Sequence, residues 1–258
     1  MKIKKPNLTG KSATLGSWIT FPCEASAEIM ANAGFDWLVI DMEHAPLGVN
    51  EASRLIRVID LAGKPVLCRL PSNDPILTKS VLDSGAHGII VPMVESAEDA
   101  QKAVASAYYP PKGKRGIGLA RAQGYGGRFE EYRQEALQNL TVIAMIETAA
   151  GLKNVKPIAS TPGIDALLIG PYDLSGSLGK IGELSHPDLN IAKKEIIAAA
   201  KEAGIGCGLH IVHPSPQNIT QALDEGYTFV AIGVDMIFLD QISRASLKMA
   251  LNHTKKLY

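Results

Sequence analysis

The 258-residue sequence is poor in cysteine, carries no net charge and has no long apolar run. Its three cysteines, Cys23, Cys68 and Cys207, are widely spaced, and none belongs to a Cys-x-x-Cys pair. An odd number of separated cysteines favours a reducing compartment over a disulfide scaffold. Lys and Arg together number 26, as do Asp and Glu, so no basic field is available to attract nucleic acid.

The sequence also contains no candidate membrane-spanning segment. No stretch approaches the roughly 20 apolar residues that a bilayer-spanning helix needs. Residues 1–12 are basic and polar and have no apolar core, unlike a secretory signal. We therefore expect a cytoplasmic protein with neither a membrane nor a nucleic-acid partner. The length suits one α/β barrel or two smaller domains.

Apolar, strand-like runs alternate with amphipathic, helix-like segments along the chain. The runs are apolar throughout, as in parallel strands that are covered on both faces. Helices are expected over residues 24–33 and 49–61, after Asp74 with Pro75 as the first helical residue, and from Ser96 onward. Strands are predicted over residues 13–21 and 88–94, ending at Asp41 and Arg69, and near Thr141, Asp165, Gly206 and Thr228.

This alternation predicts an α/β fold, a single (β/α)8 TIM barrel over residues 1–258. An open, doubly wound sheet is the alternative, and it is disfavoured because no Gly-x-Gly-x-x-Gly follows the first strand. Since the carboxyl ends of barrel strands converge on one face, charges placed there predict an active site. The charges at expected strand ends are Asp41, Arg69, Glu147, Asp173 and Asp235.

Glu147 and Asp173 end consecutive strands, so they should be neighbours at the barrel mouth. Two carboxylates with open positions for water and a chelating substrate are typical of a Mg²⁺ or Mn²⁺ site. The alternative is that each stabilises the start of the following helix. Their matching positions at strand ends favour the metal site.

Arg69 and His44 are candidate catalytic groups on the same face. An arginine can grip a carboxylate and stabilise developing negative charge, although Arg69 could instead form a structural ion pair with Asp41 or Glu43. A histidine beside carboxylates is a candidate general base near neutral pH, the alternative being a structural role. No expected strand ends in lysine, which disfavours a Schiff base. For a carbonyl substrate, a metal must then be the electron sink.

A Gly- and Arg-rich insertion separates the fourth and fifth expected strands, from Tyr109 to Arg128. Long insertions in compact barrels are usually functional or form subunit contacts, and a plain surface loop is the alternative. No Gly-Lys-Ser/Thr follows, which disfavours a phosphate-binding loop. We expect residues 116–129 at or near the mouth, where Arg121 and Arg128 grip an acidic substrate tail or bind acids of an adjacent subunit.

Several motifs in order match a known family. They are Asp41-Met42-Glu43-His44-Ala45-Pro46, Arg69-Leu70-Pro71-Ser72-Asn73-Asp74-Pro75, Val91-Pro92-Met93-Val94, Tyr109-Pro110-Pro111, Ile146-Glu147-Thr148 and Ile169-Gly170-Pro171-Tyr172-Asp173-Leu174-Ser175. The chain resembles the HpcH/HpaI aldolases, the class II, metal-dependent pyruvate aldolases typified by 4-hydroxy-2-oxoheptanedioate aldolase. The resemblance extends from Leu15 to Asp235.

The resemblance implies a barrel of the phosphoenolpyruvate/pyruvate superfamily that reversibly cleaves a 4-hydroxy-2-oxo acid to pyruvate and an aldehyde. It implies a homohexamer, a trimer of dimers, with the C-terminal helix exchanged between subunits. The cofactor is Mg²⁺, Mn²⁺ or Co²⁺, which chelates the 2-oxo acid substrate. By this likeness Glu147 and Asp173 hold the metal, Arg69 stabilises the enolate oxygen, His44 is the base, Asp83 raises its basicity, and Asp41 and Glu43 surround them.

Three residues depart from the family pattern and leave the acceptor aldehyde open. Met145 stands where glutamine is typical, Tyr172 where the residue is usually small, and His210 where it is usually aliphatic. We expect all three to line the substrate pocket beside Arg69 and Asp173, with Tyr172 acting through its backbone N–H and His210 bonding a sugar-like hydroxyl. Alternatives are a citramalyl-CoA or malyl-CoA lyase, a decarboxylating enolate enzyme, or a ligand-binding barrel without catalysis. No dedicated basic patch for CoA is present.

Overall fold

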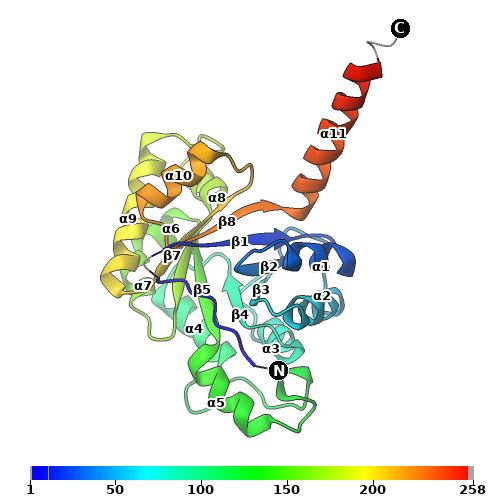
Figure 1. Ribbon diagram of the computed structural model, residues 1–258. Coiled ribbons are helices and arrows are strands. Elements are labelled where there is room, and N and C mark those ends of the chain that lie inside the picture. Colours follow the sequence, from blue (N-terminus) through cyan, green and yellow to red (C-terminus); the bar gives the residue numbers. More distant parts are fainter. Residues whose placement is uncertain (1, 11, 255–258) are drawn as a thin grey trace.

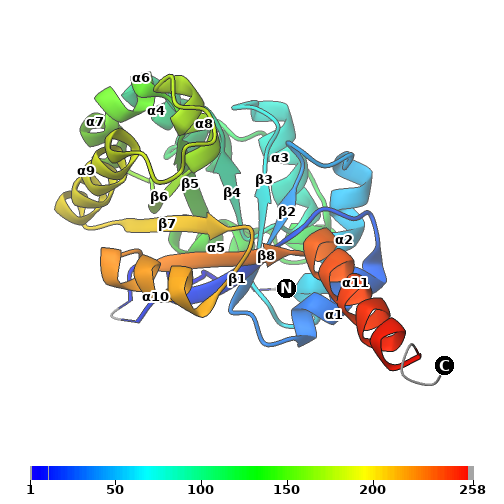
Figure 2. The ribbon, with the colours of Figure 1, turned by 90° about the horizontal axis from the view of Figure 1, so that it is seen from above.

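The computed structural model describes residues 2–10 and 12–254 and forms a closed barrel of eight parallel strands in chain order. Figures 1 and 2 show the strands at the centre with helices around them. The single-barrel prediction is confirmed and the doubly wound alternative is wrong, because β8 pairs with β1 and closes the sheet. The strands are β1 (Thr14–Ile19), β2 (Trp37–Asp41), β3 (Val66–Arg69), β4 (Gly88–Val91), β5 (Thr141–Ile146), β6 (Ala166–Ile169), β7 (Gly206–Ile211) and β8 (Phe229–Val234).

Helices cover the outside of the barrel, and the last one extends away from it (Figure 1). None of the helices that the structure describes has the length and apolarity of a bilayer-crossing segment. The helices are α1 (Glu24–Asn32), α2 (Val49–Leu61), α3 (Pro75–Ser84), α4 (Ala97–Ala107), the 3-10 turn η1 (Arg121–Gln123), α5 (Phe129–Asn139), α6 (Ala149–Lys153), α7 (Val155–Ala159), α8 (Pro171–Ser177), α9 (Pro187–Ala203), α10 (Pro216–Glu225) and α11 (Asp235–Thr254).

The predicted helix starts are confirmed where a side chain caps the helix. Asp74 accepts from the backbone N–H groups of Ile76 and Leu77, at 2.7 and 2.8 Å, and Pro75 is the first residue of α3. The Ser96 hydroxyl accepts from the N–H of Asp99 at the start of α4. Such caps satisfy N–H groups that lack a partner within the helix, and they set where α3 and α4 begin.

Aromatic residues fill the barrel interior because glycines leave them room. A Cβ on Gly16 would lie 2.2 Å from the Trp37 ring, and one on Gly208 would lie 2.1 Å from the Phe229 ring. Side chains two residues apart on a strand point to the same face. Trp18 and His210 therefore also point inward, one layer nearer the carboxyl ends of the strands, and their rings stack with centroids 4.9 Å apart.

The Gly- and Arg-rich segment between α4 and α5 lies at the amino end of the barrel. Arg121 binds Asp60 near the end of α2 at 2.5 Å, and Arg115 binds Asp83 near the end of α3 at 2.6 Å. Helices that follow barrel strands return to the amino end, so these contacts fix where the segment lies. Arg128 pairs with acids of α5. The prediction that this segment lies at the mouth is wrong within one chain.

Candidate active site

The barrel mouth brings together side chains at the carboxyl ends of β2 and β3 and just after β5 and β6. Asp41 and Arg69 are register partners at the ends of β2 and β3. Glu147 directly follows β5, and Asp173 lies in the first turn of α8, which begins after β6. Asp173 and Arg69 are close enough to Glu43 and Glu147 to affect the pKa values of those two carboxyls. The convergence of these charges at one face is as predicted from the strand ends.

Arg69 is held by two acids at this face. Its Nε and one Nη donate to the two carboxylate oxygens of Asp41, at 2.9 and 2.6 Å, and its other Nη lies 3.1 Å from Glu43. Its guanidinium carbon lies 4.4 Å from the centre of the Trp18 ring. The ion-pair alternative for Arg69 is therefore present, and it fixes the plane of the guanidinium. Such a fixed group can also present a donor to an oxyanion beside it.

Glu147 is a buried carboxylate with a backbone donor. Its Oε1 accepts from the N–H of Met93 at 2.6 Å, and a Cβ on Gly170 would lie 2.7 Å from its Oε2. Thr148, and not Glu147, caps α6 by accepting from Gly151 N–H, so the capping alternative for Glu147 is wrong. Glu147 therefore does not cap a helix. Its carboxylate is held by the Met93 N–H and lies against Gly170.

Met93 takes a backbone conformation that is uncommon for a side-chain-bearing residue. Its φ is +53°, in the left-handed region, which costs a non-glycine residue of the order of 1 kcal/mol or more. This conformation aims the Met93 N–H at Glu147. The sequence predicted residues 88–94 as one strand, whereas β4 ends at Val91. Pro92 was the available signal that the strand stops, and sequence reasoning missed the role of the N–H that follows it.

Acidic groups outnumber the cations at this site. Burial raises the pKa of Glu147 above its ordinary value, the Met93 hydrogen bond opposes this, and Glu43 and Asp173 add to the rise. Burial likewise raises the pKa of Glu43, against the opposing effects of Arg69 and His44. A carboxyl pKa rises when its charge is insufficiently compensated. The cluster therefore carries negative charge that a cation would neutralise.

The residues beside Asp173 leave it open to solvent. Tyr172 has 53% of its surface exposed, and its carbonyl accepts from the Ser175 hydroxyl at 2.6 Å. Asp173 lies within the first turn of α8, where a negative charge also favours the helix. The position of Asp173 is thus compatible with metal binding and with stabilisation of the start of α8.

His44 lies exposed in the turn that Asp41 organises. The Asp41 Oδ1 accepts from the backbone N–H groups of Glu43 and His44, at 3.0 and 3.3 Å. His44 is also near enough to Glu43 to oppose the rise in that carboxyl's pKa. An exposed imidazole beside the mouth is accessible to a substrate proton, as a general base must be.

Met145 and His210 lie inward of the charged groups. Met145 is 4% exposed and belongs to the same interior cluster as Trp18 and Ala231. His210 is register partner to Ala231 and stacks on Trp18. Both predicted pocket residues therefore face the barrel interior, below the charged rim.

Two predicted residues are bound by groups outside this charge cluster. Asp235 accepts from Thr20, through both its backbone N–H and its hydroxyl, and from the N–H of Phe21. It thereby ties the end of β8 to the loop after β1, and the expectation that it joins the reactive charges is corrected. Asp83 pairs with Arg115 at the amino end, so it does not contact His44 within one chain.

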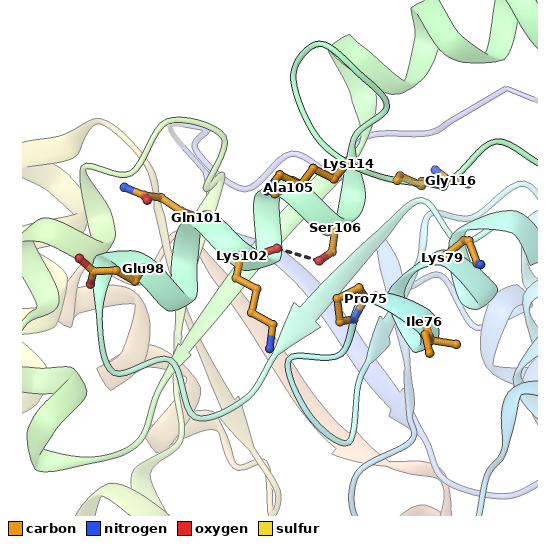
Figure 3. Close-up of a pocket in the computed structure, with 11 residues that line it drawn as sticks. Pro75, Ile76, Lys79, Glu98, Gln101, Lys102, Ala105, Ser106, Lys114 and Gly116 are labelled. Carbon is orange, nitrogen blue, oxygen red and sulfur yellow. Dashed lines mark hydrogen bonds between the residues drawn. The ribbon is translucent and has the colours of Figure 1, made fainter.

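A hollow lies on the outer wall of the barrel, between α3 and α4. It has a volume of about 690 Å³, and Figure 3 shows the side chains that line it. Lys79, Lys102 and Lys114 contribute to this lining. None of the mouth residues described above takes part in it, so this hollow is separate from the candidate active site.

A closed (β/α)8 barrel with an arginine held among acids at the carboxyl ends of its strands has these charges where barrel enzymes build their active sites. The model of the HpcH/HpaI aldolase/citrate lyase family matches residues 15–240, so the chain belongs to that family. The aldolase relatives are carbon–carbon lyases, and this chain is an enzyme of the same class.

Three relatives illustrate the similarity. The chain is 38% identical over 232 residues to 2-dehydro-3,6-dideoxy-6-sulfogluconate aldolase of Pseudomonas putida, covering 90% of each chain. It is 38% identical over 252 residues to hydroxypyruvate/pyruvate aldolase of Paraburkholderia phytofirmans, covering 95% of each. A crystal structure of a family member from Burkholderia cenocepacia superimposes with a TM-score of 0.89 at 34% identity, over 94% of this chain and 96% of that one.

Proposed function

We propose that the protein catalyses the reversible, metal-dependent aldol cleavage of a 4-hydroxy-2-oxo acid to pyruvate and an aldehyde. The observation that carries the proposal is the buried Glu147 carboxylate, which lies with Asp173 and Glu43 near Arg69. Relatives at 38% identity are named as pyruvate and sugar-acid aldolases, which supports this assignment.

The chain's own donors fit a divalent cation such as Mg²⁺, Mn²⁺ or Co²⁺. Within residues 2–10 and 12–254 no three His, Cys, Asp or Glu side chains form a ready metal cluster. Glu147 and Asp173, which are close enough to interact electrostatically, would supply two carboxylate ligands, and water and substrate oxygens would supply the others, as hard cations commonly accept. When bound, the cation polarises the 2-oxo group and so favours the enolate.

His44 transfers the proton, and Arg69 stabilises the negative charge of the enolate. In cleavage, His44, directly or through water, takes the proton from the C4 hydroxyl. The C3–C4 bond then breaks, its electron pair forms the enolate across C2 and C3, and the C4 carbonyl leaves as the aldehyde. Arg69, fixed by Asp41, presents its guanidinium to the enolate oxygen. Reprotonation at C3 gives pyruvate and restores the starting proton count.

The Tyr172 N–H and Met145 complete the 2-oxo acid side of this proposal. The backbone N–H of Tyr172 lies in the first turn of α8, where N–H groups lack helical partners and can bind a substrate carboxylate. Met145 is buried and carries a thioether where the family commonly has an amide, so it can pack but cannot donate a hydrogen bond. We therefore assign orientation of the carboxylate to Tyr172 and close packing to Met145.

Asp83 can act on His44 only across a subunit boundary. Within one chain it is bound by Arg115 at the amino end of the barrel, far from the turn that carries His44. The role implied by the family resemblance, raising the basicity of the histidine, therefore requires an assembled oligomer. We retain it as a proposal for the assembly alone.

We also propose a homohexamer, a trimer of dimers, in which α11 is exchanged between subunits. The helix extends away from the barrel in Figures 1 and 2 and exposes Leu239, Ile242, Leu247 and Met249 by 58–64%. Exposed apolar rows of this kind are typical of a subunit contact. Truncation after Phe238, which keeps the Asp235 contacts, should convert the oligomer to smaller species in light scattering, and an unchanged mass would contradict the exchange.

A cytoplasmic location is part of the same proposal. Cys23, Cys68 and Cys207 are all free, and the latter two are buried. Burial raises the pKa of the Cys207 thiol to about 12, so it stays protonated and unreactive. Free thiols in such number suit a reducing compartment.

The proposal is tested by a coupled assay for pyruvate release from several 4-hydroxy-2-oxo acids. Metal-loaded protein should release pyruvate, chelated protein should not, and added Mg²⁺ or Mn²⁺ should restore the rate. Turnover that persists after complete metal removal would contradict the mechanism. Release of a CoA thioester, or of carbon dioxide in place of an aldehyde, would identify one of the related lyase or decarboxylase activities instead.

A further inference from the structure

His210 and Trp18 occupy the part of the barrel interior that lies next to Arg69. The Arg69 guanidinium carbon is 4.4 Å from the Trp18 ring centre, and the His210 ring stacks on Trp18 at 4.9 Å with the two planes 13° apart. The three side chains are therefore contiguous. The Trp18 and His210 rings are therefore the interior surface next to the guanidinium that would receive an enolate oxygen.

The tautomer of His210 follows from its hydrogen bond. Its Nε2 lies 2.9 Å from the carbonyl oxygen of Gly233. A carbonyl oxygen can only accept, so Nε2 carries the hydrogen. Burial, helped by Arg69, lowers the pKa of His210 to about 4 against the opposing Gly233 bond, which keeps the ring neutral at neutral pH. The other nitrogen, Nδ1, is then an acceptor and cannot donate.

Trp18 adds a donor with no partner. Its ring is 97% buried, and its Nε1–H makes no hydrogen bond with any part of the chain that the structure describes. A buried donor without a partner is uncommon, because its lost hydration is not replaced. The stacked pair thus combines one unsatisfied donor with one acceptor-only nitrogen.

We propose that His210 and Trp18 form a recognition pair for a hydroxyl group on the aldehyde portion of the substrate. A hydroxyl can donate to His210 Nδ1 and accept from Trp18 Nε1–H. A carboxylate has no hydrogen for Nδ1, and an alkyl group serves neither nitrogen. Resting on the proposed aldol cleavage, the inference names the substrate class as 4-hydroxy-2-oxo acids with a further hydroxyl beyond C4, whose aldehyde product is hydroxylated.

The test compares matched aldehydes in the synthetic direction, with pyruvate as the partner. Wild-type protein is assayed for kcat/KM with glycolaldehyde and acetaldehyde, and with glyceraldehyde and propionaldehyde, which differ in hydroxyl groups. We expect the hydroxylated member to be favoured by about tenfold or more, the typical size of one hydrogen bond. A carboxylated aldehyde, succinic semialdehyde, should be disfavoured.

Variants assign this preference to the two rings. His210→Phe keeps a ring on Trp18 but removes both nitrogens, and it should reduce the hydroxyl preference by about tenfold. Trp18→Phe removes the Nε1–H and should reduce it as well. His210→Gln retains an amide donor for Gly233 and a carbonyl acceptor, so it should restore part of the preference. His253→Phe, on the exposed surface of α11, is the matched control and should keep the wild-type ratio.

The outcomes are separable from those of the proposed function. Exchange of the pyruvate methyl protons for deuterium reports enolate formation without any aldehyde. If exchange persists and the aldehyde ratio is the same in wild type, His210→Phe and Trp18→Phe, the recognition pair is refuted while the aldol chemistry stands. If wild-type protein shows no exchange, the proposed function fails and this inference fails with it.

Discussion

Replacement of Glu147 by Gln should raise the stability of the metal-free protein and weaken its metal binding. The amide keeps the size of the side chain and can still accept from Met93 N–H, but it removes one negative charge from a cluster in which acids outnumber cations. Because burial raises the pKa of Glu147, the folded protein binds this proton more tightly than the unfolded chain does. The ionised form therefore weakens the metal-free fold.

The sign of the pH dependence follows from this linkage. Below the ordinary carboxyl pKa of 4.5, Glu147 is protonated in both states and the penalty is absent. As pH rises above 4.5 and through the raised pKa, the unfolded chain ionises first and the penalty grows. Metal-free Glu147→Gln should accordingly equal wild type near pH 4 and exceed it in Tm at pH 7.5.

Added metal should raise the Tm of wild type above that of Glu147→Gln. A cation at 100 times its dissociation constant stabilises the folded state by about 2.7 kcal/mol. For a chain of this length, about 2–4 °C per kcal/mol gives a Tm rise of about 5–11 °C for wild type. Glu147→Gln, having lost one of two ligands, should show little rise. Differential scanning fluorimetry with chelator and with Mg²⁺ or Mn²⁺ measures both effects. An equal metal-induced rise in the two proteins would refute the assignment of Glu147 as a ligand.

Three further substitutions test the neighbouring groups. Arg69→Ala should leave the metal-induced Tm rise in place and lower kcat by about 10²–10³-fold, since one oxyanion donor is lost; a wild-type kcat would rule out that role. His44→Ala should slow cleavage, because the general base is lost, and a wild-type rate would assign the base elsewhere. Gly170→Ala should weaken metal binding, because its Cβ would lie 2.7 Å from Glu147 Oε2 and displace that carboxylate; an unchanged metal titration would contradict this.

Much of the barrel could be predicted because its strands are uninterrupted apolar runs. Each run that ends in a charge, such as Trp37 to Asp41 or Val66 to Arg69, marks a strand end that the structure reproduces. The helix starts at Asp74 and Ser96 were predictable because capping depends on adjacent residues alone. Closure of the sheet follows from the number and order of these units.

Other features depend on contacts that adjacent residues do not reveal. Asp235 ends a strand like the reactive acids, but its oxygens are taken by the loop after β1, which is over 200 positions away in the chain. Arg121 appeared in a Gly-rich insertion suited to a mouth loop, yet it follows a helix and so lies at the amino end with Asp60. The left-handed backbone conformation of Met93 could not be predicted from the preferences of its side chain.

The central claim is that this barrel mouth stabilises the enolate of a 2-oxo acid with a divalent metal. Its most direct test follows the methyl signal of pyruvate by proton NMR in D₂O, with Mg²⁺-loaded protein, chelated protein and Glu147→Gln. We expect rapid loss of the methyl signal with the Mg²⁺-loaded wild type, and buffer rates with the other two. Absence of exchange in the loaded protein, or equal exchange in the chelated protein, would contradict the account.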